Sequence, residues 1–189
     1  MNYVIIRVVF SVQTTWISRS DERRNFMHRV DYAPYSRSPK STWPDFVFTN
    51  PDGSIALVVE AKNRLNSSRR WAAEMRRNMH AHGAWPHTAH FLLALPDKFY
   101  LWRDNANAPG MVIPDYELDA TFALGPFFQR FGISPENMSA ETFELVIGSW
   151  LEDLRLGGLV PAGPYQEWLV VTGLQHIIQE GSVSQPLSL

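Results

Sequence analysis

"WPDFVFTNPDGSIALVVEAKNR", residues 43–64, contains two apolar runs joined by a turn sequence. "DFVFT" and "SIALVVEAK" are rich in β-branched and aromatic residues, and "NPDG" is typical of a tight turn, so the stretch predicts a β-hairpin. Three charged residues interrupt the pattern: Asp45 opens the first strand, and Glu60 and Lys62 close the second. Buried charge is costly unless it is paired or binds a metal ion. These residues are therefore the first candidates for a functional site.

The length of the turn decides which side chains share a face of this hairpin. Opposed residues share a face, and so do alternate residues along one strand. A connection with an even number of residues puts Asp45 opposite Val58, whereas a three-residue bulged loop would reverse the faces. With the even connection, one face carries Asp45, Val58, Glu60 and Lys62, and the other carries Ile55, Leu57, Val59 and Ala61.

The two carboxylates suit a small divalent cation. As diagonal neighbours, Asp45 and Glu60 would have Cβ atoms about 7 Å apart. Magnesium prefers a few such oxygens and completes its coordination with water and substrate phosphate. Lys62 could then orient or deprotonate a water, or neutralise charge that develops on phosphorus. The alternative is a strand-end ion pair in which Lys62 neutralises one carboxylate.

The surrounding pattern predicts an α/β sheet. A strand is expected over 3–10, a short helix over 18–30 and a loop over 31–44. After the hairpin, apolar residues at helical spacing predict a helix from Ser67 or Ser68 to His82. "HFLLALP" (90–96) and "KFYLWR" (98–103) predict two neighbouring strands. The order strand, strand, helix, strand, strand indicates a sheet with a helix crossing one face.

The C-terminal part predicts mainly helices. "FALGPFFQRFG" predicts a short helix, and "SAETFELVIGSWLEDLRLG" predicts a longer one that begins with Ser139 as its cap and packs through an apolar stripe. "PYQEWLVVTGLQHIIQEG" predicts one further helix, and the last eight residues predict a loose tail. We therefore expect a core over 1–133 and a helical extension over 134–189 that packs on it.

Composition narrows the class of protein. The 189 residues are 45% hydrophobic and include no cysteine, which excludes disulfides and thiolate zinc sites. No apolar run approaches the roughly 18 residues of a membrane span. "NYVIIRVVF" at the N-terminus is interrupted by Arg7 and lacks a cleavage site for a signal peptide, so we expect a cytoplasmic protein.

At Asp45, Glu60 and Lys62 the chain resembles the PD-(D/E)XK nuclease superfamily, over approximately residues 40–105. The resemblance implies a restriction-endonuclease-like mixed sheet with flanking helices. It also implies that Asp45 and Glu60 bind Mg²⁺ or Mn²⁺ while Lys62 assists the attacking water. The implied activity is hydrolysis of phosphodiester bonds, in DNA, and cutting two strands is compatible with a homodimer. The alternative is a catalytically inactive module of the same fold that binds nucleic acid or a protein.

Relatives of this kind carry further site residues on helices. A helix glutamate near the metal corresponds here to Glu22, in the charged segment 18–30. Glu74 is a second additional candidate, since the helix after the lysine contributes to the site in some members. Glu74 could equally pair with Arg70 or Arg77 on its own helix.

Basic residues concentrate in the first part of the chain. Residues 1–80 contain 13 Lys and Arg against 7 Asp and Glu, whereas residues 81–189 contain 4 against 12. Such a basic part can attract phosphate backbones, and the alternative is an ordinary solvated helix surface. The candidates for binding nucleic acid are Lys40, Arg64, Arg69, Arg70, Arg76 and Arg77.

Overall fold

The computed structural model describes residues 44–82, 86–103, 106–158 and 160–184, which all belong to one compact unit of the chain. The strand expected over 3–10 and the helix expected over 18–30, with Glu22, lie outside these residues, as does Lys40.

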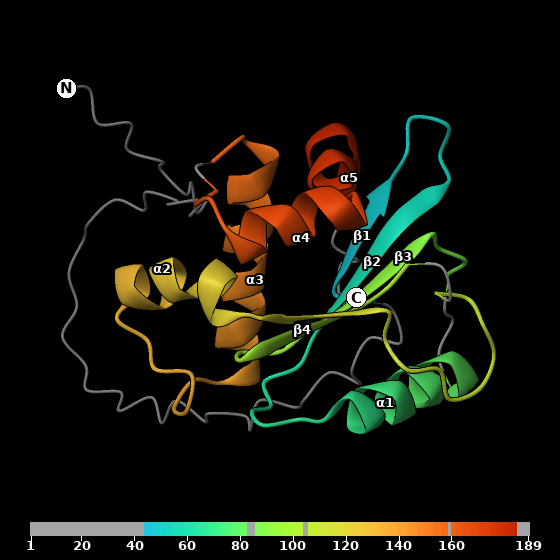
Figure 1. Ribbon diagram of the computed structural model, residues 1–189, viewed down its shortest axis with the longest axis horizontal. Helices are drawn as coiled ribbons and strands as arrows, with labels where there is room; N and C mark the ends of the chain where they lie inside the picture. The colour runs from blue at the N-terminus through green and yellow to red at the C-terminus, as the bar shows by residue number, and fades with distance from the viewer. Residues whose placement is uncertain (1–43, 83–85, 104–105, 159, 185–189) are drawn as a thin grey trace, which may run out of the picture. The chain divides into compact units, whose positions relative to one another are not determined.

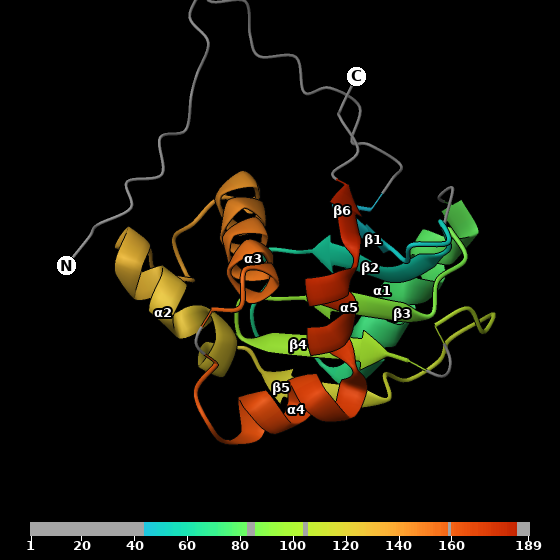
Figure 2. The same ribbon diagram turned by 90° about the horizontal axis from the view of Figure 1, so that it is seen from above.

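The described residues form one mixed sheet (Figure 1), with strand order β5-β4-β3-β2-β1-β6, and Figure 2 labels all of these strands. β2 and β3 are parallel, and all other neighbours are antiparallel. The α/β class is therefore confirmed, while the specific restriction-endonuclease-like arrangement stays a prediction. The strands are β1 (Phe46–Thr49), β2 (Ile55–Ala61), β3 (His90–Ala94), β4 (Lys98–Trp102), β5 (Tyr116–Asp119) and β6 (Ser182–Ser184).

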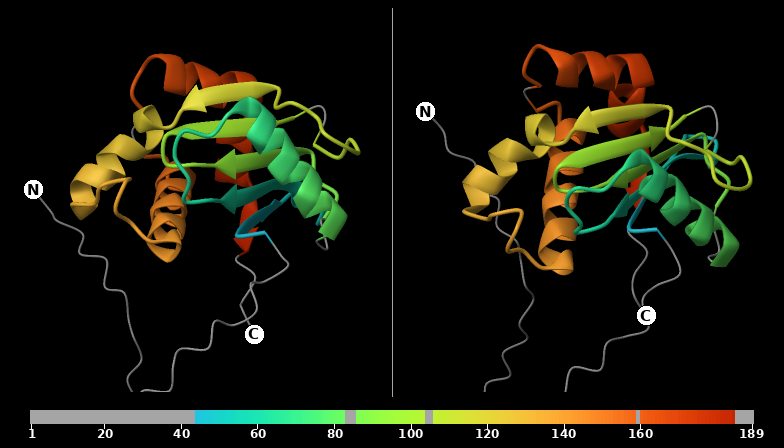
Figure 3. Two further views of the ribbon diagram at one scale, coloured as in Figure 1. Left: turned by 90° about the horizontal axis from the view of Figure 1, so that it is seen from below. Right: turned by 60° about the horizontal axis from the view of Figure 1, so that its bottom comes forward.

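One face of the sheet is covered by α1 (Arg69–His82), which connects the parallel strands β2 and β3 (Figure 3). Parallel strands need such a crossover, so the predicted strand–helix–strand order is confirmed. Ala72 of α1 belongs to the same buried cluster as Val58 and Phe91 of the sheet. Ser68 caps the helix, because its Oγ accepts a hydrogen bond from the N–H of Trp71 at 3.2 Å.

Four helices from the C-terminal part cover the other face (Figure 2). The predicted cap of the longest is confirmed, because Ser139 Oγ accepts a hydrogen bond from the N–H of Thr142 at 3.1 Å. Trp150 of this helix packs against Phe99 of β4, with ring centres 4.8 Å apart. α3 therefore packs on the sheet, while the division into a core over 1–133 and a helical extension over 134–189 stays a prediction. The helices are α2 (Thr121–Phe131), α3 (Ala140–Arg155), α4 (Pro164–Thr172) and α5 (Leu174–Glu180).

The sequence-based assignment was wrong at three places in the C-terminal part. The single helix expected over 164–181 is divided into α4 and α5 at Gly173, whose φ of 77° is left-handed. Part of the expected tail is β6, which pairs with β1 at the edge of the sheet. β5 was not predicted, because "YELD" is short and contains two acidic residues at a sheet edge. None of the helices in the described ranges is both long and apolar enough to span a membrane.

Gly173→Ala should lower the free energy of unfolding by about 1–2 kcal/mol, because a side chain at a left-handed position is strained. Gly125→Ala is the matched control, since Gly125 lies inside α2 and a Cβ there would meet nothing within 4 Å. The control should raise stability by up to about 1 kcal/mol. Urea unfolding of both variants tests the pair, and equal effects would contradict the role given to Gly173.

Candidate functional site

The β1–β2 hairpin contains two irregularities whose effects on the side-chain faces cancel. Thr49 pairs with Ile55, so an odd number of residues connects the strands. The register then shifts by one, because Phe48 pairs with Leu57 and Ala56 is bulged out. Each irregularity alone exchanges the two faces, and together they restore the predicted faces beyond the bulge. Ile55, on the turn side of the bulge, packs on the α1 face, so its predicted face was wrong.

This register brings Asp45 directly beside Glu60. It places Asp45 opposite Glu60, and not opposite Val58 as the sequence analysis predicted. Asp45 Oδ2 accepts a hydrogen bond from the N–H of Ala61 at 2.7 Å. The backbone N–H of Asp45 in turn donates to the carboxylate of Glu60. The two candidate carboxylates are therefore opposed across the hairpin, which is closer than the diagonal arrangement that was expected.

Glu60 is a buried carboxyl group, with 7% of its surface exposed. Its pKa is raised to about 7, first because burial disfavours the charged form and next because Asp45 adds a second negative charge. Lys62 opposes part of this rise, through its charge and through a hydrogen bond from Nζ to Glu60 Oε1. The ion pair that the sequence left open as an alternative is thus present beside the opposed carboxylates.

Glu144 of α3 lies in the electrostatic field of the same group. Its pKa is raised by burial and then by the charge of Asp45, whereas the charge of Lys62 lowers it. Glu144 was not predicted as a site residue, because the α3 pattern indicated only a packing helix. The one available signal was an acidic residue between the buried positions Phe143 and Val146. What brings Glu144 to the site is the packing of α3 beside the hairpin, which helical periodicity does not predict.

A hydrogen bond connects the segment after β2 to the segment before α3. Asn63, directly after Lys62, donates from Nδ2 to the carbonyl of Met138 at 2.6 Å. Within the described ranges, no three His, Asp or Glu side chains are grouped closely enough to hold a metal ion together. The candidate ligands there are consequently the pair Asp45 and Glu60, with Lys62 and Glu144 around them.

The basic residues of the loop and of α1 differ in their surroundings. Arg64 is exposed, and its guanidinium lies 4.6 Å from the ring centre of Trp71. Arg70 is paired with Glu74, from Nε to Oε1 at 3.2 Å. The pairing within α1 that the sequence left open for Glu74 is therefore observed. Arg77 is exposed, and its Nη2 donates a hydrogen bond to Oδ1 of the neighbouring Asn78 at 3.3 Å.

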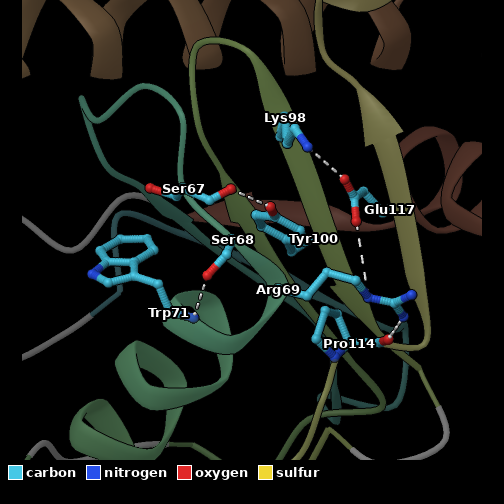
Figure 4. A network of polar contacts seen from close by, with 8 residues as sticks. All are labelled: Ser67, Ser68, Arg69, Trp71, Lys98, Tyr100, Pro114 and Glu117. Carbon is cyan, nitrogen blue, oxygen red and sulfur yellow. Dashed lines mark hydrogen bonds and ion pairs between the residues drawn. The ribbon is translucent and has the colours of Figure 1, made fainter.

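Arg69 connects the start of α1 to the β5 edge of the sheet (Figure 4). Its Nη2 donates to the carbonyl of Pro114 at 2.5 Å, and its Nε lies 3.8 Å from Glu117 Oε2. Lys98 reaches the other oxygen of Glu117 at 2.8 Å. Half of the Arg69 side chain is exposed, so part of it is accessible to a ligand while its guanidinium contacts the β5 edge.

Arg76 is a correction to the predicted set of nucleic-acid-binding residues. It is fully buried, and its Nη2 donates to the carbonyls of Ala106 at 2.6 Å and Ala108 at 2.8 Å. Its position, three and four residues after the buried Ala73 and Ala72, puts it on the face of α1 that packs against the sheet. Arg76 therefore holds the segment after β4 and is not available at the surface.

Comparison of the chain with protein-family models finds no match, and comparisons with curated proteins and with solved structures find no significant match. The resemblance to the PD-(D/E)XK superfamily therefore rests on the residues of the chain itself.

Arg76→Met should lower the free energy of unfolding by about 2–4 kcal/mol, because a buried and a partly buried carbonyl lose their charged donor. The neighbouring Arg77→Met, on the exposed side of α1, should change it by less than about 0.5 kcal/mol. Urea unfolding at neutral pH measures both. Similar losses in the two variants would mean that Arg76 does not support the core.

Glu60 should make stability depend on pH. Its pKa in the folded protein, about 7, exceeds the ordinary 4.5, so the folded state holds the proton more tightly than the unfolded state. Stability should therefore fall as the pH rises from about 4.5 to 7 and level off above. Relative to wild type, Glu60→Gln should become more stable over that window by up to about 3 kcal/mol. Parallel urea-unfolding profiles of the two proteins from pH 5 to 8 would contradict this.

Proposed function

We propose that the protein is a metal-dependent nuclease that hydrolyses phosphodiester bonds in DNA. The observation that carries the proposal is the opposition of Asp45 and Glu60 at the end of one hairpin, with Lys62 on the same strand end. Two carboxylates that repel each other in a partly buried place favour a cation between them. The pKa of Glu60 is raised first by burial and next by this repulsion.

The chemistry of the donor set fits Mg²⁺ or Mn²⁺. Asp45 and Glu60 offer carboxylate oxygens, the ligands that hard divalent cations prefer, and the chain has no cysteine. A cation bound there would polarise a phosphoryl oxygen and make a bound water more acidic. Two protein ligands leave the remaining positions to water and substrate, as is usual for Mg²⁺ at phosphate sites.

The surrounding residues have complementary roles in this proposal. Lys62 would exchange its hydrogen bond to Glu60 for one to the attacking water or to a non-bridging phosphate oxygen, where its positive charge offsets the developing negative charge. Glu144 would accept a hydrogen bond from water at the site, because its carboxylate shares the field of Asp45 and Lys62. The exposed Arg64, Arg70 and Arg77 would attract the phosphate backbone.

The second candidate is a catalytically inactive module that binds nucleic acid or a protein. The ion pair between Lys62 and Glu60 favours it, since this pair already neutralises one carboxylate. The preference for DNA, the homodimer and the cytoplasmic location come from the sequence analysis and stay predictions.

Cleavage of supercoiled plasmid and of single-stranded DNA, with Mg²⁺, Mn²⁺ or EDTA, tests the proposal. Wild type should cut with either metal, and Asp45→Asn, Glu60→Gln and Lys62→Ala should each lose at least about 100-fold in rate. Glu74→Gln is the control, because Glu74 is paired on α1 and should retain its activity within about twofold.

The melting temperature with and without metal separates the two candidate functions. A site that binds Mg²⁺ or Mn²⁺ raises the melting temperature of wild type, and Asp45→Asn should abolish the rise. A wild type that neither cuts nor responds to metal would overturn the nuclease proposal in favour of the binding module.

A further inference from the structure

The loop of residues 62–68, between β2 and α1, is fixed by contacts with two other parts of the chain: the segment before α3, and the β3–β4 turn with β4. Asn66 has a φ of 56°, an uncommon conformation for a residue other than glycine. Such a conformation persists where the surrounding structure imposes it. The three hydrogen bonds that fix the loop join Asn63 Nδ2 to Met138 O at 2.6 Å, Asn66 N to Asp97 Oδ2 at 2.8 Å, and Tyr100 Oη to Ser67 O at 2.7 Å (Figure 4 shows the last).

Arg64 lies in the middle of this fixed loop, two residues after Lys62. Its guanidinium is held over the ring of Trp71, 4.6 Å from the ring centre. Its neighbours Arg69 and Arg70 have carboxylate partners, whereas the described residues provide no carboxylate or hydrogen-bond acceptor for the guanidinium of Arg64. Among the described residues, Arg64 is thus an exposed cation that is oriented by an aromatic ring and whose N–H donors meet no acceptor.

The stacking of Arg64 on Trp71 orients the guanidinium for binding an anion. A guanidinium on an indole face keeps its edge, with its N–H groups, directed outwards. Holding the long side chain in one orientation beforehand lowers the entropy that binding would otherwise cost. A planar, fork-shaped donor of this kind matches the oxygens of a phosphate group better than a lysine does.

The position of Arg64 relative to Lys62 indicates which phosphate of a bound strand Arg64 would contact. Two residues of chain span at most about 7 Å between Cα atoms. The Cα atom of Arg64 therefore lies close to that of Lys62 at the candidate site, and its guanidinium lies over Trp71.

We propose that Arg64, positioned by Trp71, binds a phosphate of the nucleic-acid strand next to the phosphate that is cleaved. The substrate is then a strand of DNA or RNA with at least two consecutive phosphates, and an isolated phosphodiester is a poor substrate. This inference rests on the proposed nuclease function. Trp71 is a positioning residue in it, because it acts through Arg64.

The test compares two substrates: an oligonucleotide, and bis(4-nitrophenyl) phosphate, which has one phosphodiester and no neighbouring phosphate. Arg64→Ala should raise KM for the oligonucleotide roughly tenfold or more, and this loss should exceed any loss on the small diester by about the same factor. Arg64→Lys should recover only part of it, since the fork is lost. Trp71→Leu should give an intermediate loss, and Trp71→Phe a smaller one, because phenylalanine keeps an aromatic face.

Arg130→Ala is the matched control. Arg130 on α2 also lies over aromatic rings, 4.8 Å from the ring centre of Phe127, but on an element that packs against the opposite face of the sheet. Its removal deletes the same charge and should change neither substrate's kinetics by more than about twofold. DNA and RNA oligonucleotides are tested side by side, and the kind bound more tightly identifies the source of the phosphate.

Oligonucleotide binding by the Glu60→Gln variant tests the role of Arg64 without measuring cleavage. In this background, Arg64→Ala should weaken oligonucleotide binding and reduce the slope of log affinity against log salt by about one. If wild type cuts neither substrate and does not respond to metal, but this slope changes, the nuclease proposal fails while Arg64 still binds a backbone phosphate. If wild type cuts both and Arg64→Ala affects them equally or not at all, the phosphate site fails and the nuclease proposal stands. Absence of any oligonucleotide binding would overturn both.

Discussion

The burial of Glu60 beside Asp45 is the constraint on which the candidate site depends. A carboxyl group with 7% exposure next to another carboxylate is unfavourable, and the raised pKa expresses that cost. Lys62 and the backbone N–H of Asp45 offset only part of it. The arrangement exists because the odd connection and the bulge at Ala56 together bring both carboxylates to one strand end. A hairpin with only one of the two irregularities would separate them.

Helices pack on both faces of the sheet that contains Asp45 and Glu60. On one face, α1 follows from the parallel pairing of β2 with β3, and its buried Arg76 fastens the segment that follows β4. On the other face, α3 packs its apolar stripe on the sheet and brings Glu144 into the field of Asp45. The C-terminal part therefore contributes to the core and also places Glu144 beside the candidate site.

Individual residues show how far the sequence could predict the structure. The cap at Ser139 was predictable because capping is a local interaction between neighbours in the chain. Gly173 was not recognised as a break, because the apolar pattern continues across it and only its left-handed φ ends α4. Arg76 was assigned to the surface by its charge, although its spacing from Ala72 and Ala73 placed it on the buried face. β6 was missed because three residues acquire strand structure only by pairing with β1.

The sequence by itself determined the hairpin, the crossover helix, the two following strands, and the choice of Asp45, Glu60 and Lys62 as the charged residues of the candidate site. These features follow from periodicity, capping and turn chemistry, which act over a few neighbouring residues. Only the tertiary structure decided that Asp45 faces Glu60, that Glu144 joins them, that Arg76 is buried, and that Arg64 is held over Trp71. The reason is physical: register, burial and ring stacking are set by contacts between segments distant in the chain, and no local pattern encodes which segments will meet.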